Sequence, residues 1–169
     1  MTKRPRELKL AFASTWPLRG TMVFERLFHP NLRVSLSEKR NILRDAIAIW
    51  MYEPTRGTLI GEVYSTPVEK ELDPDEEGYS DIAPYRGRKA AYVYSIGILK
   101  PFQGRQLGKV LKAYHLGRIR QAGFHWAIGH AKHPESCALN VAFGAKLLAR
   151  HPNWYGTGQL FRFYEMKLQ

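Results

Sequence analysis

The apolar and polar positions along the chain follow two different periods. Segments in which apolar residues alternate with polar ones, or form short continuous runs, are typical of strands. They predict strands over residues 7–13, 46–52, 58–66, 90–99, 124–131, 146–150 and 159–168. A short turn with Pro54 and Gly57 separates the second strand from the third, which predicts a β-hairpin.

Helical spacing of apolar residues predicts four helices between the strands. They cover residues 21–28, 37–46, 105–122 and 135–143. Ser37 is the expected N-cap of the second helix. Arg40 would then stand where a capping box has Glu or Gln, so no capping box is expected. Gly123 and Gly144 are placed to end the last two helices.

Residues 67–89 interrupt this pattern with three prolines, two glycines and a cluster of acidic side chains. They predict a long surface loop, mobile in part. The sequence contains no internal repeat and no linker that would separate two domains. The mixture of hairpin and βαβ-like order predicts an α/β (mixed α+β) fold. We expect one mixed sheet with helices on both faces, in a single domain over residues 1–169.

Length and composition narrow the class of protein. The 169 residues suit one domain, and 44% of them are hydrophobic, which is enough for a packed core. The chain lacks the long apolar run of a membrane span, and its basic N-terminus lacks the apolar segment of a secretory signal. A single cysteine, Cys137, excludes an internal disulfide and a multi-cysteine zinc site. We therefore expect a cytoplasmic protein with no membrane partner.

The charge is strongly positive and unevenly distributed. The chain has 26 Lys and Arg against 15 Asp and Glu, a net charge of +11. Residues 69–81 hold seven acidic side chains and one basic one, whereas residues 82–134 hold ten basic side chains and no acidic one. A long segment without a carboxylate attracts anions. Nucleic acid, a phosphorylated cofactor and an acidic protein surface are all candidates.

The junction between predicted strand 90–99 and predicted helix 105–122 carries the most specific signal. From Ile98 to Lys109 it reads ILKPFQGRQLGK. A strand that enters a helix through a glycine-containing turn presents free backbone N–H groups at the positive end of the helix dipole, a geometry that binds a diphosphate. Arg105 and Lys109 add positive charge beside it. Neither the dinucleotide-binding pattern G-x-G-x-x-G nor the Walker pattern is present.

This stretch resembles the coenzyme A loop of the GNAT superfamily of acetyl-CoA-dependent N-acyltransferases, which reads Q/R-x-x-G-x-G/A. The first and last positions match Gln103 and Gly108, and the family's central Gly is replaced by Gln106. The order of predicted elements is similar along essentially the whole chain. The resemblance implies a mostly antiparallel sheet of six to seven strands, splayed at the central strand, with four helices.

The resemblance also implies where acetyl-CoA would bind. The pantetheine arm would pair with strand 90–99 beside Ile98 and Leu99. The diphosphate would be surrounded by Gln103, Gly104, Arg105, Gln106, Leu107, Gly108 and Lys109. The thioester would lie where the sheet splays, and Gly97 suits the bulge that opens it. No bound metal is expected.

The implied reaction is direct attack of an amine on the thioester, so the amine must lose a proton and the thiolate must gain one. The family's base is commonly a Glu eleven residues before the Gln of the loop, where this chain has Tyr92. A phenol is a weak base, and Tyr92 would orient a relay water instead. Glu62, on the neighbouring predicted strand, is either the carboxylate that reaches the cleft or a solvated strand residue.

The family's acid is commonly a Tyr four residues before the Gly that closes the late helix, where this chain has Asn140. Asn140 would hydrogen-bond the sulfur or pantetheine, and Ser136 lies one turn earlier on the same face.

Tyr155 either enters the site or is an aromatic residue at a hairpin tip. His130 and His133 with Cys137 lack an evident fourth ligand, so they do not predict a metal site.

Two classes of function follow. The first is an enzyme that transfers an acetyl or other acyl group from coenzyme A to an amine, which could be a small molecule, a protein amine or aminoacyl-tRNA. The second is a GNAT-like module that has lost turnover and binds nucleic acid or a protein. The basic residues Lys112, Arg118 and Arg120 exceed what one cofactor needs. The chain could be a monomer or a homodimer.

Overall fold

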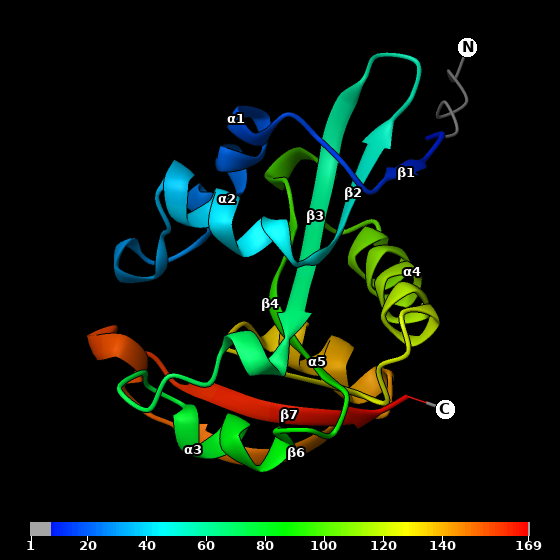
Figure 1. The fold of residues 1–169 in the computed structure, drawn as a ribbon. Coiled ribbons are helices and arrows are strands. Elements are labelled where there is room, and N and C mark those ends of the chain that lie inside the picture. The colour runs from blue at the N-terminus through cyan, green and yellow to red at the C-terminus, as the bar shows by residue number, and fades with distance from the viewer. Residues whose placement is uncertain (1–7, 169) are drawn as a thin grey trace.

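A computed structural model describes residues 8–168 and places seven strands in one sheet. The strands are β1 (Ala11–Ala13), β2 (Ile47–Glu53), β3 (Thr58–Pro67), β4 (Ala90–Ile98), β5 (Trp126–Ala131), β6 (Lys146–His151) and β7 (Phe161–Lys167). Their spatial order is β1-β2-β3-β4-β5-β7-β6 (Figure 1). Every neighbouring pair is antiparallel except β4 and β5, which are parallel. The predicted mixed, mostly antiparallel sheet and its β2–β3 hairpin are confirmed.

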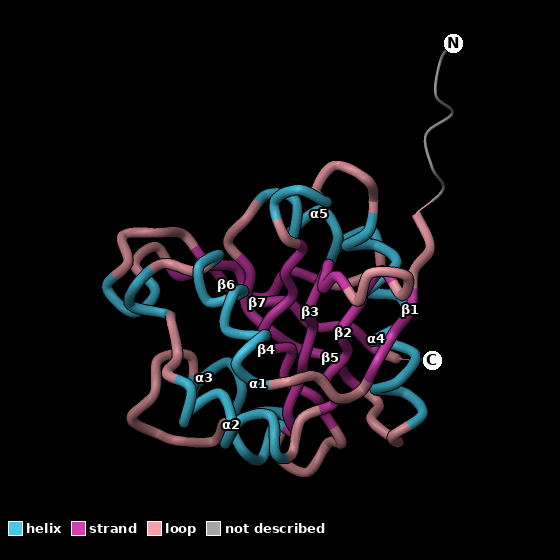
Figure 2. The backbone as a smooth tube through the Cα atoms, turned by 90° about the horizontal axis from the view of Figure 1, so that it is seen from above, coloured by secondary structure: helices cyan, strands magenta, loops and turns pink. Residues whose placement is uncertain are grey.

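Helices lie on both sides of this sheet, as expected. The α-helices are α1 (Leu18–Thr21), α2 (Leu36–Arg44), α3 (Tyr79–Ile82), α4 (Leu107–Gln121) and α5 (Pro134–Ala142). Figure 1 shows α1 and α2 on one side of β3 and α4 on the other, and Figure 2 shows the strands in the middle of the molecule. Within residues 8–168, no helix combines the length and the apolar character needed to cross a membrane.

The core has separate parts on the two faces of the sheet. On the α4 face, Val63 and Ile60 of β3 pack with Leu107 and Leu111, and the last two point inward because they lie one turn apart on α4. On the α2 face, Tyr64 packs with Trp50. The two apolar layers therefore hold α4 and α2 against the central strands.

Three predicted elements differ from the structure near the N-terminus. The first strand is only Ala11–Ala13 rather than 7–13, and Glu7 lies outside the described residues. The helix expected over 21–28 is α1 followed by a 3-10 helix over Met22–Leu27. The prediction that α2 lacks a capping box is wrong. Ser35 is the N-cap, its hydroxyl accepts from the Glu38 backbone N–H, and the Glu38 carboxylate accepts from the Ser35 N–H.

Residues 67–89 are more ordered than the surface loop that the sequence predicts. They contain α3 and two 3-10 turns, Val68–Lys70 and Ala83–Tyr85. Val68, Ile82 and Tyr85 are buried in a cluster with residues of β4, β5 and β7. The segment is therefore a part of the core that carries an acidic outer edge, and the burial of three spaced apolar residues is what fixes it.

The bulge in β4 lies at Tyr94, not at Gly97. Tyr64 pairs with Ser95 and Ser65 pairs with Val93, so Tyr94 is the extra residue, whereas Gly97 pairs regularly with Glu62. The bulge reverses the side-chain alternation along the strand. Tyr94 stacks on Tyr64, but Ile96 and Ile98 pack with the α4 cluster. Strict alternation along a regular strand would place Tyr94, Ile96 and Ile98 on one face.

The sheet opens between its two parallel strands. β4 and β5 are paired only over Ala90–Tyr92 and Trp126–Ile128. Beyond this point β4 stays paired with β3 and β5 stays paired with β7. Gly129 stands at the point of divergence, where an added Cβ would lie 2.7 Å from the Val93 carbonyl oxygen. A glycine is required there because the two backbones approach each other closely.

Candidate active site

A cleft of about 540 Å³ lies where β4 and β5 diverge. Its floor includes Ser95 and Ile96 of β4 and Gly129 of β5. One wall comes from α4 and α5, and the other comes from the acidic segment and the aromatic residues beside it. Its lining includes Lys112 of α4 on one face of the sheet and Glu38 of α2 on the other, an arrangement that suits two substrates.

The predicted diphosphate loop lies beside this cleft. Gln103 Nε2 donates to the Ile98 carbonyl at 2.8 Å, and this bond ties the loop to the end of β4. An added Cβ at Gly108 would lie 3.9 Å from Leu139 of α5, which lines the cleft. Among the described residues, the lining includes Ser136 and Asn140 but not Ile98, Leu99 or the loop from Gln103 to Lys109. The loop therefore forms an outer rim, at the N-terminus of the 15-residue helix α4.

Gln106, the departure from the family pattern, has a strained backbone. It is the residue before α4 and has φ +58°, in the left-handed region that favours glycine. We expect Gln106→Gly to raise the free energy of unfolding by up to about 1 kcal/mol, because the strain costs more than the added chain entropy. Chemical denaturation measures this. The control is Ala113→Gly, at an exposed position in the middle of α4, which should lower the stability by about 0.5–1 kcal/mol. A loss of stability in Gln106→Gly would contradict the strain argument.

Glu62 does not reach the cleft. It is 1% exposed, and Lys39 Nζ of α2 lies 2.7 Å from its Oε1 while Trp50 Nε1 donates to its Oε2 at 2.7 Å. Burial raises the pKa of Glu62 above its usual value, although Lys39 and Trp50 oppose the shift. Lys39 also contacts Glu25 at 3.0 Å. Both carboxylate oxygens of Glu62 are therefore committed to a buried ion-pair network behind the sheet, and it is not a solvated strand residue either.

Lys112 is a buried cation on the α4 wall of the cleft. It is 6% exposed, and its Nζ donates to Asn140 Oδ1 of α5 at 2.5 Å. No carboxylate of the described residues forms an ion pair with it. Burial lowers the pKa of Lys112 to about 8. Asn140 thus orients an ammonium group that can lose its proton near neutral pH.

From the sequence, Lys112 is expected only as one member of a basic helix face. A signal was available, since Lys112 lies four residues after Gly108 and four before the buried Leu116, which places it on the inner side of the helix. Arg118 and Arg120, in contrast, are exposed. The charge of the helix therefore divides into a cleft residue and an outer face.

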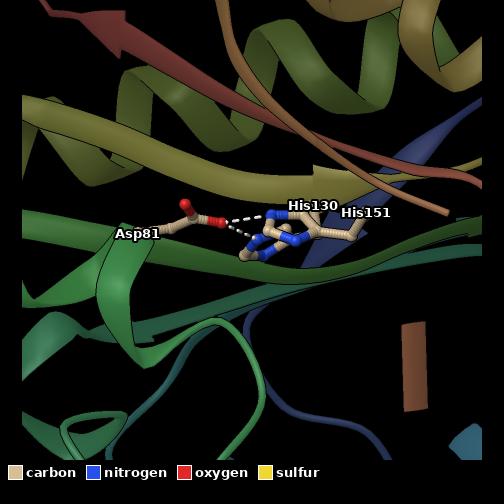
Figure 3. Close-up of side chains that lie close together, drawn as sticks. All are labelled: Asp81, His130 and His151. Carbon is tan, nitrogen blue, oxygen red and sulfur yellow. Dashed lines mark hydrogen bonds and ion pairs between the residues drawn. The ribbon is translucent and has the colours of Figure 1, made fainter. Parts of the chain in front are cut away.

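Tyr92, expected near the base position, lines the cleft and is hydrogen-bonded on its far side. Its hydroxyl lies 3.0 Å from His130 Nδ1. His130 Nε2 lies 2.9 Å from Asp81 Oδ2, and His151 Nε2 lies 2.6 Å from the same oxygen (Figure 3). His130 and His151 come from β5 and β6, and Asp81 comes from α3. Tyr92 and His130 both line the cleft, whereas Asp81 and His151 do not, so residues distant in the sequence form one network that runs from the cleft wall inward.

The metal-like grouping differs from the one that the sequence suggested. Among the described residues, the Asp81, His130 and His151 ligand-type atoms lie within 4.8 Å of one another, but His133 and Cys137 do not join them. Cys137 Sγ instead lies 3.7 Å from the Ala131 carbonyl. Of His130 and His133, only His130 therefore belongs to a cluster of ligand-type side chains.

The wall opposite α4 is acidic and aromatic. Tyr155 lies on it, and its hydroxyl donates to Glu76 while its backbone N–H donates to Glu77. The carboxylates that line this end are Glu25, Glu38, Glu71, Asp73, Glu76 and Glu77, together with the basic Arg33 and Lys70. In a chain with a net charge of +11, this concentration of carboxylates gives the cleft an end with an excess of acidic groups.

Ser95 supplies a free polar group at the floor of the cleft. Its hydroxyl is buried and has no hydrogen-bond partner among the described residues. It is 6% exposed and follows the bulge residue Tyr94. A buried hydroxyl is costly unless it is paired, so a bound polar group would complete it. The floor therefore fits a ligand with carbonyl or amide groups, such as the pantetheine arm.

Comparison with known proteins reveals similarity of fold. No protein-family model matches the chain, and no curated protein matches it by sequence. Among solved structures, the ribosomal-protein-S18-alanine N-acetyltransferase of Escherichia coli superposes with a TM-score of 0.72 at 11% identity, covering 95% of each chain.

Two further structures contain coenzyme. The GNAT superfamily phosphinothricin acetyltransferase of Sinorhizobium meliloti, in complex with AcCoA, has a TM-score of 0.67 at 20% identity, covering 94% of this chain and 88% of that one. The spermidine N-acetyltransferase of Vibrio cholerae, in complex with CoA and spermine, has a TM-score of 0.68 at 14% identity, covering 94% and 95%. On the evidence of the splayed sheet, the loop before α4 and these superpositions, the chain has the fold of the GNAT superfamily.

Proposed function

We propose that this protein is a member of the GNAT superfamily that transfers an acetyl group from acetyl-CoA to the amine of a cationic acceptor. The observation that carries the proposal is the cleft between the diverging parallel strands β4 and β5, with the glycine-containing loop at its rim. The fold is shared with enzymes crystallised with AcCoA or CoA. Free N–H groups at the start of α4 would bind the diphosphate, with Arg105 and Lys109 beside them.

The cofactor would enter along the α4–α5 side of the cleft. Ile98 and Leu99 would flank pantetheine, and Ser136 and Asn140 would face it from α5. The loop residues proposed for the diphosphate are Gln103, Gly104, Arg105, Gln106, Leu107, Gly108 and Lys109. This arrangement would bring the thioester to the floor at Ser95, whose unpaired hydroxyl would then gain a partner.

Lys112 is the proposed acid of the reaction. The amine nitrogen forms a bond to the thioester carbonyl carbon, the C–S bond breaks, and the leaving thiolate accepts a proton from the Lys112 ammonium. A pKa of about 8 for this group lies close to the pKa of about 8.5 of a free thiol, so the transfer is nearly balanced. Asn140, at the position where the family commonly has its Tyr, would hold the ammonium in place.

The acceptor would approach from the acidic end, where Tyr155 is held by Glu76 and Glu77. Five carboxylates around this end, all of those that line it except the Glu25 paired with Lys39, favour an amine that carries a further positive charge. Aminoacyl-tRNA, with its phosphates, would meet repulsion at this end, so a cationic small molecule or a basic protein segment suits it better. The proposed acceptor class is therefore polyamines and similar cations.

The test compares spermine with benzylamine, an amine with one charge, as acceptors of acetyl from acetyl-CoA. We expect a lower KM for spermine, and the double variant Glu76→Gln/Glu77→Gln should raise the KM for spermine about tenfold while changing that for benzylamine less than twofold. Release of coenzyme A thiol measures the rate. Glu135→Gln, on α5 and outside the cleft lining, is the control. An equal effect on both amines would exclude charge recognition at this end.

A further inference from the structure

A continuous chain of hydrogen bonds leads from the cleft to a carboxylate behind it. Tyr92 of β4 lines the cleft, and its hydroxyl is 3.0 Å from His130 Nδ1. The opposite ring nitrogen, Nε2, is 2.9 Å from Asp81 Oδ2. The His130 side chain is 2% exposed and that of Asp81 is 13% exposed, so water competes little for these bonds. His130 also lines the cleft, but both of its ring nitrogens are hydrogen-bonded within the protein, so a ligand reaches it through Tyr92. The order from the cleft inward is phenol, imidazole, carboxylate.

The positions of the protons follow from the partners. The hydrogen bonds from the two histidines outweigh burial and lower the pKa of Asp81, so it is a carboxylate and only accepts. Burial lowers the pKa of His130, so its ring is neutral and carries one proton. That proton must lie on Nε2, which faces Asp81, and Nδ1 is therefore left as an acceptor. Tyr92 then donates to Nδ1, and the lone pairs of its oxygen remain for a group in the cleft.

We propose that Tyr92, His130 and Asp81 form a proton relay that deprotonates the acceptor amine. As the new C–N bond forms, the amine proton passes to the Tyr92 oxygen while the phenolic proton passes to His130 Nδ1. The imidazolium that results is stabilised by the Asp81 carboxylate, and its proton returns to water after the product leaves. This inference rests on the proposed acetyl transfer. Tyr92 is the catalytic residue, and His130 and Asp81 act through it.

The relay explains how a phenol can stand where the family commonly has a Glu. Burial and the neighbouring Tyr94 raise the pKa of Tyr92 well above its usual value, so a free tyrosinate is not available near neutral pH. A phenol that passes its own proton to an imidazole needs no tyrosinate in the resting state. His130 therefore supplies the basicity, and Tyr92 supplies the reach into the cleft.

A bound metal ion is the competing occupant of Asp81, His130 and His151. Tetrahedral Zn²⁺ with bonds of about 2.0–2.1 Å holds its ligand atoms about 3.3 Å apart. Asp81 Oδ2 lies only 2.9 Å from His130 Nε2 and 2.6 Å from His151 Nε2, which are hydrogen-bond distances. In addition, both ring nitrogens of His130 already have protein partners. The geometry therefore favours protons between these groups.

The charged groups around His130 come from several elements. Asp81 lies on α3, His151 on β6, Tyr92 on β4, and Glu77 precedes α3. The rings of Trp154 and Phe163 contact the imidazole in a tilted arrangement. Asp81 and Glu77 raise the His130 pKa, whereas burial and His151 lower it. Removal of the Asp81 charge should therefore lower the His130 pKa. The acidic limb of the kcat/KM profile follows this value only if His130 takes part in the reaction.

The kinetic test uses acetyl transfer to spermine, followed by thiol release, over pH 5.5–9.5. We expect Tyr92→Phe and His130→Gln to lower kcat about 100-fold with the KM for acetyl-CoA unchanged. Asp81→Asn should lower the maximal kcat/KM. It should also move the acidic limb of the kcat/KM profile to lower pH. His125→Gln, an exposed histidine before β5, should stay within twofold of the wild type. Full rates in Tyr92→Phe, or an unmoved acidic limb in Asp81→Asn, would overturn the relay.

Two measurements keep this test separate from the proposed function. The ¹⁵N shifts of the His130 ring, which need no acceptor, should show a protonated Nε2 and an unprotonated Nδ1 at pH 7.5, and the reverse tautomer would overturn the relay. Acetyl-CoA binding should be unaltered in all three variants, so its absence in the wild type would refute the acetyltransferase instead. Activity that EDTA removes and Zn²⁺ restores would replace the relay by a metal site.

Discussion

Replacement of Lys39 by methionine is expected to lower the free energy of unfolding by about 3–5 kcal/mol at pH 8. Lys39 is fully buried, and its Nζ contacts Glu62 at 2.7 Å, Glu25 at 3.0 Å and the Thr21 carbonyl at 3.2 Å. Methionine keeps the volume but leaves Glu62 and Glu25 facing each other without a cation. The cost is therefore that of two uncompensated buried carboxylates rather than that of one lost pair.

Chemical denaturation at several pH values measures this effect. Burial raises the pKa of Glu62 above its unfolded value of about 4.5, so protonation of this group favours the folded state. The loss in Lys39→Met should consequently shrink as the pH falls toward the Glu62 pKa, because a protonated Glu62 needs no cation. Lys70→Met is the matched control, since Lys70 pairs with Asp45 at 3.1 Å on the exposed surface. It should cost less than about 1 kcal/mol. If the two variants lost equal free energy of unfolding, the buried network of Lys39 would stabilise the fold no more than an exposed ion pair does.

Replacement of Lys112 by methionine is expected to lower kcat about 100-fold and to change its dependence on pH. In the wild type, Lys112 acts in its protonated form. Because burial lowers the pKa of Lys112 to about 8, kcat should fall as the pH rises through this value. In the variant this fall should disappear, since no group of that pKa remains to supply the proton. The acidic limb assigned to His130 should stay in place.

Lys109→Met separates this role from simple charge attraction. Lys109 lies on the same helix three residues earlier but is exposed at the rim beside the loop. Its loss should raise the KM for acetyl-CoA several-fold and leave the alkaline fall of kcat unchanged. A Lys112→Met enzyme that keeps both its kcat and its alkaline fall would remove Lys112 from the reaction. Thermal unfolding of each variant confirms that the fold is retained.

Much of the fold could be predicted from local signals, because its strands and its three longer helices, α2, α4 and α5, follow clear periods. The α4 region was predicted as 105–122 and is Leu107–Gln121, since the apolar spacing and Gly123 mark it directly. The bulge at Tyr94 could not be predicted, because it depends on the register between β3 and β4. The burial of Val68, Ile82 and Tyr85 was missed for a related reason: prolines and acidic residues dominate the local pattern, and tertiary packing overrides it.

The candidate site divides in the same way. The loop from Gln103 to Gly108 is contiguous, so one stretch of sequence suffices to identify it. The network of Tyr92, His130 and Asp81 joins β4, β5 and α3, and its members are 38 and 49 residues apart. Glu62 lies on a strand next to β4, which favours a place in the cleft, but its partner Lys39 lies 23 residues earlier on a helix that covers the other face. Such pairings become visible only when the elements are packed.

The most direct test of the central claim is acetyl-CoA binding, measured by calorimetry and thermal unfolding. If the loop and cleft bind the coenzyme with a Kd near 10 µM, about 1 mM acetyl-CoA should stabilise the protein by about 2.7 kcal/mol. Gly108→Trp, which fills the space between Ile98 and Leu139, should abolish the stabilisation by acetyl-CoA. Gly117→Trp is the control, because no atom lies within 4 Å of an added Cβ at this position of the same helix, and it should keep the stabilisation. Absence of any stabilisation at millimolar acetyl-CoA, with salt-sensitive binding of nucleic acid instead, would contradict the acetyltransferase and favour a binding module of the same fold.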